Sequence, residues 1–184
     1  MAVKHWMAVV LAVAVLGAGA CATGPAELGA MQIQRASGHV EILRGSDSID
    51  VSDVEGLEPG DVIVTGATGT AHLNLASDAQ RVDIAPDSRV RVRSNSVVEG
   101  LEGSLLARAS HAPTSVLFDG VKAEFSNARF RLDRGFSSSR AASYDGTVEL
   151  GSPGETRIDL QRLYQVDVAA GDLPEHPVPY RVDE

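Results

Sequence analysis

The alternation of apolar and polar residues from Gln32 onward is the feature that most limits the folds open to this chain. Apolar side chains recur at every second position in short runs, with a polar or charged residue between the members of each pair. The clearest pairs are Val40/Ile42, Leu73/Leu75, Val82/Ile84, Val90/Val92, Phe130/Leu132, Val148/Leu150, Ile158/Leu160 and Val166/Val168. Because successive side chains of a strand point to opposite faces, this pattern predicts sheets with one buried face and one solvated face.

Turn-forming residues separate the alternating runs. The turns are Glu58-Pro59-Gly60-Asp61, Gly66-Ala67-Thr68-Gly69, Ala85-Pro86-Asp87-Ser88, Asp145-Gly146 and Gly151-Ser152-Pro153-Gly154. Strands spaced roughly every 8 to 12 residues with such turns are typical of sandwiches, barrels and solenoids, and no segment carries a convincing helical stripe. The sequence therefore predicts an all-β domain over residues 32–172. The segment 173–184 is rich in proline, and we expect it to be an extended tail.

The first twenty residues have the features of an export signal. Lys4 supplies the positive charge, and residues 7–16 form an unbroken run of ten apolar side chains. The whole apolar stretch, residues 6–20, has fifteen residues, whereas a helix that spans a bilayer needs roughly 20. We therefore predict a cleaved signal peptide over residues 1–20.

Cys21 follows a run of small residues that resembles a bacterial lipobox. The run is Leu16-Gly17-Ala18-Gly19-Ala20-Cys21, and small residues suit the narrow cleft of a lipoprotein signal peptidase. Ala18-Gly19-Ala20 also satisfies the small-x-small rule of the ordinary signal peptidase, which would cut the same bond. Because a lone thiol in an oxidising compartment invites intermolecular pairing, lipid capping would protect the single cysteine. We predict lipidation at Cys21.

Residues 21–31 are small and interrupted by glycine and proline, which predicts a flexible tether between the lipid and the domain. Ala22, rather than Asp, follows the cysteine. In Gram-negative lipoproteins of similar pattern, this implies transport to the outer membrane. We expect an exported protein that is anchored in the cell envelope on the periplasmic face, in the outer membrane if the host has one.

The charge balance excludes one class of partner. The chain has 16 Lys and Arg residues against 25 Asp and Glu residues, a net charge of −9. Proteins that bind nucleic acid gain most of their affinity from a basic surface, so nucleic acid is excluded as a partner. The same charge should repel anionic lipid headgroups, and we expect the domain to be tethered to the bilayer rather than embedded in it.

Arg89, Arg91 and Arg93 place three guanidinium groups on one face of a predicted strand. Successive members should lie about 6.6 Å apart along the strand. Asp83 and Asp87 are the nearest acids in sequence, and we expect them to pair with the arginines in a solvated charge lattice. The alternative is a contact with an anion or an acidic polysaccharide, because the guanidinium fork matches carboxylate and phosphate geometry.

The sequence carries no recognisable catalytic or metal-binding motif. The histidines outside the signal are His39, His72, His111 and His176, and none has a ligand spacing such as His-x-x-x-His. A Gly-x-Ser-x-Gly elbow is also missing from the sequence. His39 and His72 fall on the predicted solvated faces of strands. We expect no catalytic residue, no metal site and no cofactor.

Four phenylalanines cluster within nineteen residues: Phe118, Phe125, Phe130 and Phe136. We expect them to form the thickest part of the core, with Phe136 the weakest candidate because Ser137-Ser138-Ser139 follow it in an evident loop. An exposed aromatic groove for a peptide or a glycan is the alternative.

Several segments, taken in order, resemble the FecR-like domain family. The segments are Gly38-His39-Val40-Glu41-Ile42-Leu43-Arg44-Gly45, Leu57-Glu58-Pro59-Gly60-Asp61-Val62-Ile63-Val64-Thr65-Gly66, Gly69-Thr70-Ala71-His72-Leu73-Asn74-Leu75, Arg81-Val82-Asp83-Ile84-Ala85-Pro86-Asp87-Ser88, residues 125–132 and Tyr144-Asp145-Gly146-Thr147-Val148-Glu149-Leu150. The resemblance covers about residues 37–171. Two steps depart from the family pattern: Asn127-Ala128-Arg129 replaces Gly-Thr, and Asp78-Ala79-Gln80 replaces the usual Asp-Gly-Ser turn.

The resemblance implies a twisted, solenoid-like or roll-like all-β module, with a β-sandwich as the alternative. Members of the family are best known in membrane regulators that relay iron-uptake signals to a sigma factor. Such a regulator needs a cytoplasmic domain ahead of a spanning helix, whereas only five residues precede Trp6 here. We therefore expect a non-catalytic envelope lipoprotein whose domain binds a protein partner or relays an envelope signal. The alternative is a polysaccharide-binding or glycan-active accessory protein.

Overall fold

The computed structural model describes residues 31–152, 157–169, 172–173 and 176–180. The predicted signal peptide, the predicted lipidation site Cys21 and residues 21–30 of the predicted tether lie outside these residues. Within the described ranges, no helix combines the length and the apolar character that a membrane crossing requires.

The described residues form fourteen strands and one short 3-10 helix, which confirms the predicted all-β class. The strands are β1 (Gln32–Ser37), β2 (Val40–Arg44), β3 (Asp47–Asp50), β4 (Val62–Thr65), β5 (Thr70–Asn74), β6 (Gln80–Ile84), β7 (Arg89–Ser94), β8 (Val97–Phe118), β9 (Val121–Arg134), β10 (Ser139–Asp145), β11 (Val148–Gly151), β12 (Arg157–Leu160), β13 (Tyr164–Val168) and β14 (Val178–Pro179). The 3-10 helix η1 (Val51–Asp53) follows β3, and the Asp50 side chain caps it by accepting a hydrogen bond from the Ser52 backbone N–H.

All the strands belong to one antiparallel sheet that is not closed into a barrel. The main path runs β14-β13-β10-β9-β8-β7-β4-β2-β3, while β1, β5 and β6 branch from β8, and β11 and β12 branch from β9. The strands β1, β3, β12 and β14 each pair with a single neighbour among the described strands. The sheet therefore ends in open edges.

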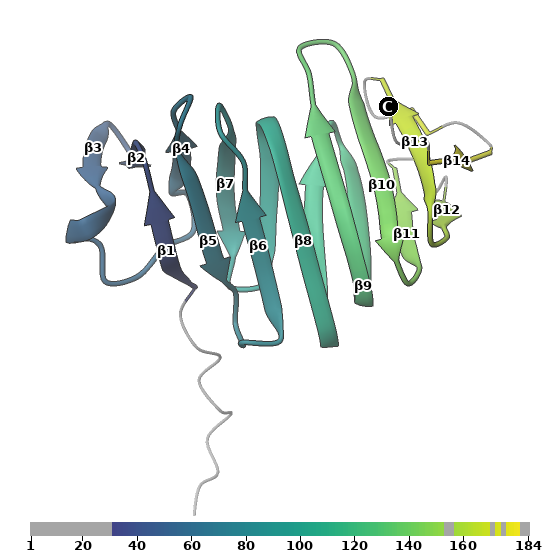
Figure 1. The fold of residues 1–184 in the computed structure, drawn as a ribbon, viewed down its shortest axis with the longest axis horizontal. Coiled ribbons are helices and arrows are strands. Elements are labelled where there is room, and N and C mark those ends of the chain that lie inside the picture. The colour runs from purple at the N-terminus through teal and green to yellow at the C-terminus, as the bar shows by residue number, and fades with distance from the viewer. Residues whose placement is uncertain (1–30, 153–156, 170–171, 174–175, 181–184) are drawn as a thin grey trace, which may run out of the picture.

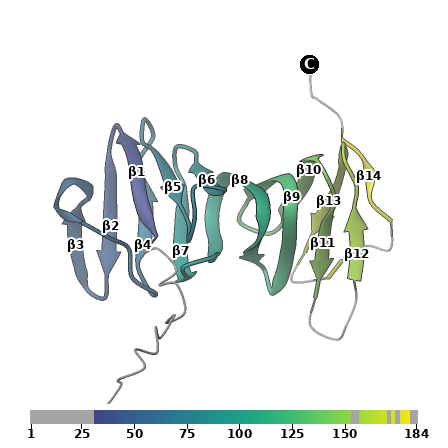
Figure 2. The same cartoon turned by 90° about the horizontal axis from the view of Figure 1, so that it is seen from below.

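The sheet forms two layers because its two longest strands change partners along their length. In β8, residues 97–102 pair with β7, residues 105–109 pair with β6, and residues 114–118 pair with the first part of β9. The changes occur near Gly103 and His111, whose backbone φ angles are 79° and 68°. We call the layer with β1, β5, β6, β10, β13 and the central part of β8 the front layer, and the layer with β2, β4, β7 and β11 the back layer (Figures 1 and 2).

This arrangement combines features of the two predicted architectures. The layers face each other as in a sandwich, while β8 and β9 pass from one layer to the other as in a roll. In the back layer, the two ends of β8 approach each other: the N–H of Ser115, near the end of β8, donates to the carbonyl of Ser96, the residue just before β8, at 3.3 Å.

The core fills the space between the layers and is made of the residues that the alternation predicts. Fifteen of the sixteen residues in the eight predicted pairs are buried, and Ile158 is partly buried against the core. Ile42 and Ile63 enter from the back layer, and Leu73 and Val82 enter from the front layer; all four have an exposed fraction of 0%. The burial of these side chains is the main force that holds the layers together.

The phenylalanine cluster is a core feature, as predicted, for three of its four members. The ring of Phe130 lies 6.1 Å from that of Phe118 and 5.7 Å from that of Phe125, centroid to centroid. All three side chains are buried. Phe136, in the loop after β9, is fully exposed, so the core prediction is wrong for this residue.

The turn before β4 contains Gly60-Asp61, and the carboxylate of Asp61 is buried there. Asp61 is 1% exposed and accepts two hydrogen bonds from the Arg44 guanidinium, at 2.9 Å and 2.8 Å, and a third from the Glu58 backbone N–H at 2.8 Å. These bonds fix the turn at residues 58–61 to strand β2. Burial raises the pKa of the Asp61 carboxyl, but the bonds and the charge of Arg44 outweigh burial and hold this pKa below its usual value.

Part of the predicted C-terminal tail pairs with the domain. Strand β14 lies antiparallel to β13, and the Tyr180 N–H donates to the Leu163 carbonyl at 2.8 Å. The Tyr180 ring packs edge-on against the ring of Tyr144 on β10, with centroids 5.1 Å apart. The tail thus reaches the margin of the groove described next.

Candidate functional site

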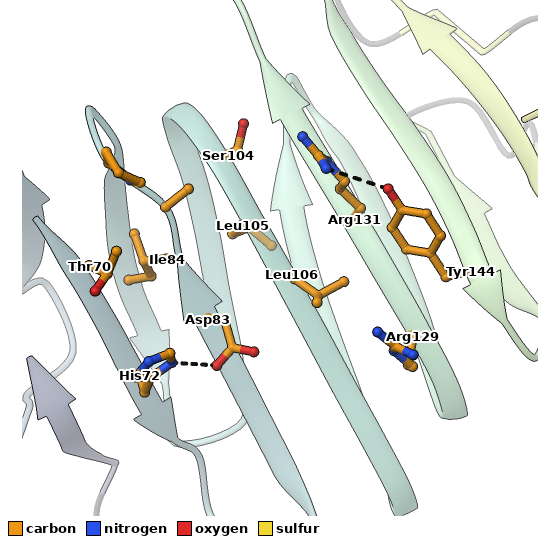
Figure 3. A pocket seen from close by; sticks show the side chains of 12 residues that line it. Thr70, His72, Asp83, Ile84, Ser104, Leu105, Leu106, Arg129, Arg131 and Tyr144 are labelled. Atoms are coloured by element: carbon orange, nitrogen blue, oxygen red, sulfur yellow. Dashed lines mark hydrogen bonds and ion pairs between the residues drawn. The ribbon is translucent and has the colours of Figure 1, made fainter. Parts of the chain in front are cut away.

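An open groove of about 720 Å³ lies on the outer surface of the front layer (Figure 3). Strands β5, β6, β8, β9 and β10 supply its walls and floor. Its lining residues are Thr70, His72, Asp83, Ile84, Ala85, Pro86, Ser104, Leu105, Leu106, Arg129, Arg131 and Tyr144. We call it the front groove. It combines an apolar middle with charged groups on two sides.

A cluster of charged groups around Asp83 forms one side of the front groove. The His72 Nδ1 lies 2.6 Å from Asp83 Oδ1, and the Arg81 Nε donates to the same oxygen at 2.5 Å. The second carboxylate oxygen of Asp83 faces Arg108 at 3.4 Å. The cluster arises because β6 pairs with β5 on one side and with β8 on the other, which brings outward-facing residues of three strands together.

Arg131 and Tyr144 form the opposite side of the groove. The Arg131 Nε donates to the Asp133 carboxylate at 2.7 Å, and its Nη1 lies 3.5 Å from the Tyr144 hydroxyl. The hydrogen bond to Asp133 is the main reason that the pKa of Arg131 is raised. The Tyr144 hydroxyl also lies 2.9 Å from that of Tyr180, and this bond raises the pKa of Tyr180. Arg131 therefore remains a fixed cation in the groove.

The serine that lines the groove, Ser104, is not hydrogen-bonded to the His72–Asp83 pair. His72 and Asp83 form a pair of the kind that activates a serine in hydrolases. The Ser104 hydroxyl, however, donates to Asp133 at 2.6 Å, and Figure 3 shows Ser104 and His72 on different sides of the groove. What this arrangement offers a ligand is ion pairing, hydrogen bonding and an apolar floor.

The predicted arginine row lies elsewhere, on β7 in the back layer, and its expected acid partners are wrong. Arg91 and Arg93 both pair with Glu99 on β8, at 3.2 Å and 2.7 Å, and neither pairs with Asp83 or Asp87. The reason is that β7 lies between β4 and β8, whereas Asp83 lies on β6 in the other layer. Arg89 stands opposite Glu102 in the strand register. Whether this row contacts an anion or a polysaccharide stays a prediction.

The residues of the front groove were not singled out as a site by their sequence pattern. His72 and Asp83 were expected on solvated strand faces, and the structure places them there, half-buried at the edge of the groove. Arg129 and Arg131 alternate with buried residues on β9. The alternation shows that such residues point outward, but it does not show that β5, β6, β8 and β9 set them side by side.

The described part of the chain contains no group of three or more His, Cys, Asp and Glu side chains that could hold a metal ion.

Among the solved structures that are similar to this chain are two from one bacterium. Both are crystal structures of a protein from Parabacteroides distasonis ATCC 8503 that is described as a "putative anti-sigma factor". The first has a TM-score of 0.54 and 17% sequence identity, covering 65% of this chain and 59% of that one. The second has a TM-score of 0.52 and 16% identity, covering 64% and 58%. This likeness is one of fold.

The alignment thus spans less than two thirds of the length of these structures. No family model and no curated protein sequence matches the chain. The likeness to a FecR-like domain therefore rests on the sequence motifs given above.

Proposed function

We propose that this protein is a non-catalytic lipoprotein of a bacterial cell envelope, and that its FecR-like β domain relays an envelope signal by binding a partner protein in the front groove. The observation that carries the proposal is the groove itself: an open, partly apolar hollow lined by residues of five strands, with charged groups from β5, β6 and β9. Sites that bind a ligand are commonly apolar hollows with a few well-placed polar groups.

The fold supports a regulatory role. The similar solved structures are described as those of an anti-sigma factor candidate, and the motifs of this chain resemble those of envelope modules that pass signals between proteins. Because those structures extend beyond the region matched by this chain, the role of the whole regulator does not carry over. We propose that this protein supplies the envelope-facing binding step.

The spacing between Cys21 and the domain limits where the partner can be. Met31, the first described residue, is fully buried in the core, so the domain begins ten residues after Cys21. A fully extended chain of that length reaches about 35 Å. A protein anchored by lipid at Cys21 would therefore present its groove close to the membrane surface, to a membrane protein or to a protein held near the membrane.

The alternative role, as a polysaccharide-binding or glycan-active accessory protein, has one observation in its favour. Arginine side chains and the Tyr144 ring lie together at the front groove, and acidic sugars are recognised by such groups. Binding to an acidic polysaccharide is therefore included as a competing outcome in the experiments below.

Blocking the groove should abolish recovery of the partner. Leu106 and Leu117 both lie on β8 and are both half-buried, but Leu106 lines the front groove and Leu117 faces outward from the back layer. We expect a stoichiometric protein to copurify with the wild-type lipoprotein from detergent-solubilised membranes of its host. Leu106→Arg should reduce the recovered partner at least tenfold, because it places bulk and charge in the groove, and the matched variant Leu117→Arg should not. Equal recovery with both variants, or no partner with the wild type, would contradict the proposal.

A further inference from the structure

We infer that Arg108 and Arg129, at one end of the front groove, form a carboxylate-binding site that takes an acidic segment of a partner protein. The inference rests on the proposed function, because it names the chemistry of the segment that the groove would hold.

Three arginines from neighbouring strands stand in one row across the outer face of the front layer. In the strand register, Arg81 of β6 is opposite Arg108 of β8, and Arg108 is in turn opposite Arg129 of β9. Side chains directly opposite each other in an antiparallel pair have Cβ atoms about 5 Å apart, and like charges in this position destabilise the sheet. An arrangement of this kind concentrates positive charge on a protein whose net charge is −9.

The acids near this row do not neutralise it. Asp83 is shared, since one of its oxygens contacts His72 and Arg81 while the other faces Arg108 at the long distance of 3.4 Å. Among the ion pairs and hydrogen bonds of the described residues, none involves Arg129.

The acid that stands opposite Arg129 in the register is also engaged elsewhere. Asp145 on β10 accepts a hydrogen bond from the Gly146 N–H at 3.1 Å and lies 3.8 Å from Arg162. The row therefore ends in a guanidinium that can donate hydrogen bonds to an external carboxylate.

Arg129 borders two hollows. It lines the front groove and also a smaller hollow of about 310 Å³, which Arg108, Ser110, Asn127 and Asp145 help to line. A chain lying along the front groove would pass this residue and could place a carboxylate between Arg129 and Arg108. Guanidinium groups bind carboxylates with charge-assisted and often bidentate hydrogen bonds, which makes them the preferred partners for such groups.

The rest of the groove favours a peptide over an acidic glycan. In its middle, Leu106 and Pro86 are accessible and suit apolar side chains, while Ile84 and Leu105 lie beneath them and are buried in the core. Sugar rings are bound mainly by stacking on aromatic faces, and Tyr144 is the one aromatic residue among those that line the groove. Its hydroxyl is already bonded to Tyr180. An acidic segment with interspersed apolar residues matches both the charge and the floor.

The test uses the full mature lipoprotein in detergent and a fluorescein-labelled peptide of sequence Glu-Leu-Glu-Glu-Leu-Glu-Glu-Leu. We expect saturable binding by fluorescence anisotropy, and no binding of the same peptide with Gln in place of Glu. Arg129→Gln should raise the dissociation constant of the peptide about tenfold, because it removes one charge-assisted contact. Adding Arg108→Gln should raise the dissociation constant further. Arg157→Gln removes an exposed arginine from β12, away from the groove, and should leave the constant within twofold of the wild-type value.

A second variant separates lost binding from lost folding. Arg129→Glu places a complementary charge opposite Arg108 but a like charge opposite Asp145, so we expect its thermal midpoint to stay close to that of the wild type while peptide binding is lost. Equal peptide affinity for the wild type and Arg129→Gln would overturn the inference. Stronger binding of polygalacturonate than of the peptide would overturn it in favour of a glycan.

Failure of this site and failure of the proposed function give different results. If the double variant Arg108→Gln/Arg129→Gln still recovers the membrane partner as well as the wild type does, the inference fails and the proposed function stands. If the wild type recovers no partner, the proposed function fails whatever the model peptide does.

Discussion

Replacing Cys21 by Ser should move this protein from the membrane fraction to the soluble fraction of the envelope almost completely. One acyl chain gives only marginal membrane binding, whereas two or more chains anchor a protein stably. Because the domain carries excess negative charge, it should not rebind to anionic lipids once the chains are missing. We expect the ratio of membrane-bound to soluble protein to fall by about 100-fold or more.

The control for this experiment is Ala22→Ser, which makes a similarly small change next to the lipid site and should leave the protein in the membrane. Export itself should survive in Cys21→Ser, since Ala18-Gly19-Ala20 still satisfies the ordinary signal peptidase rule. Mass spectrometry of the mature N-terminus should find the acyl chains on Cys21 in the wild type. A Cys21→Ser protein that still pellets with membranes would rule out the lipid anchor.

The variant Asp61→Asn should lose about 3 kcal/mol of unfolding free energy at pH 7, because breaking a buried ion pair leaves a partner uncompensated. Asp61 is 1% exposed and holds Arg44, while Arg44 keeps 34% of its side-chain surface exposed; water can reach the orphaned guanidinium, so we place the loss at the low end of the range for such pairs. Denaturation in urea, followed by circular dichroism, measures it. Asp167→Asn, which removes an exposed carboxylate paired with Arg140, should cost less than about 0.5 kcal/mol.

The same variant should change how stability depends on pH. The folded-state pKa of Asp61 lies below its usual value, mainly because the hydrogen bonds from Arg44 and from the Glu58 backbone outweigh the effect of burial. A depressed folded-state pKa gives stability that is present above the unfolded value, about 3.9, and is lost as the pH falls through the folded value. The difference between the wild type and Asp61→Asn should therefore be constant from pH 7 to about 5 and shrink below about pH 4. A constant difference down to pH 2 would show that the carboxylate charge does not matter.

The faces of the strands could be predicted from the sequence because burial alone sets them. Val90 and Val92 are buried while Arg91 between them faces outward, and the same holds along β6 and β11. The one exception in the eight pairs is Ile158 on β12, a strand at the open edge of the sheet, where a single neighbour leaves the side chain partly exposed.

The layers could not be predicted, because the sequence does not mark where β8 and β9 change partners. Strand β8 has 22 residues, but its apolar–polar alternation taken segment by segment predicts several short strands. Gly103 gives a hint, since its positive φ favours glycine. His111 adopts a positive φ as well, but histidine does not indicate such a conformation in the way that glycine does.

The candidate site could not be predicted from the sequence for a related reason. The charges of Arg108 and Arg129 are visible in the sequence, but their meeting depends on the register between β8 and β9. The error about the acid partner of Arg91 and Arg93 has the same origin: proximity in sequence favoured Asp83 and Asp87, whereas strand pairing supplies Glu99. The local alternation shows which residues face outward, but it does not show which residues of other strands lie beside them.

Photo-crosslinking in living cells tests directly whether a partner protein occupies the front groove. A benzophenone amino acid would replace Thr70, which lines the front groove, and in a matched strain it would replace Lys122, which is exposed on the back-layer part of β9. We expect one discrete protein adduct from position 70 and none from position 122. Equal adducts from both positions, or a polysaccharide adduct alone from position 70, would contradict the proposed function.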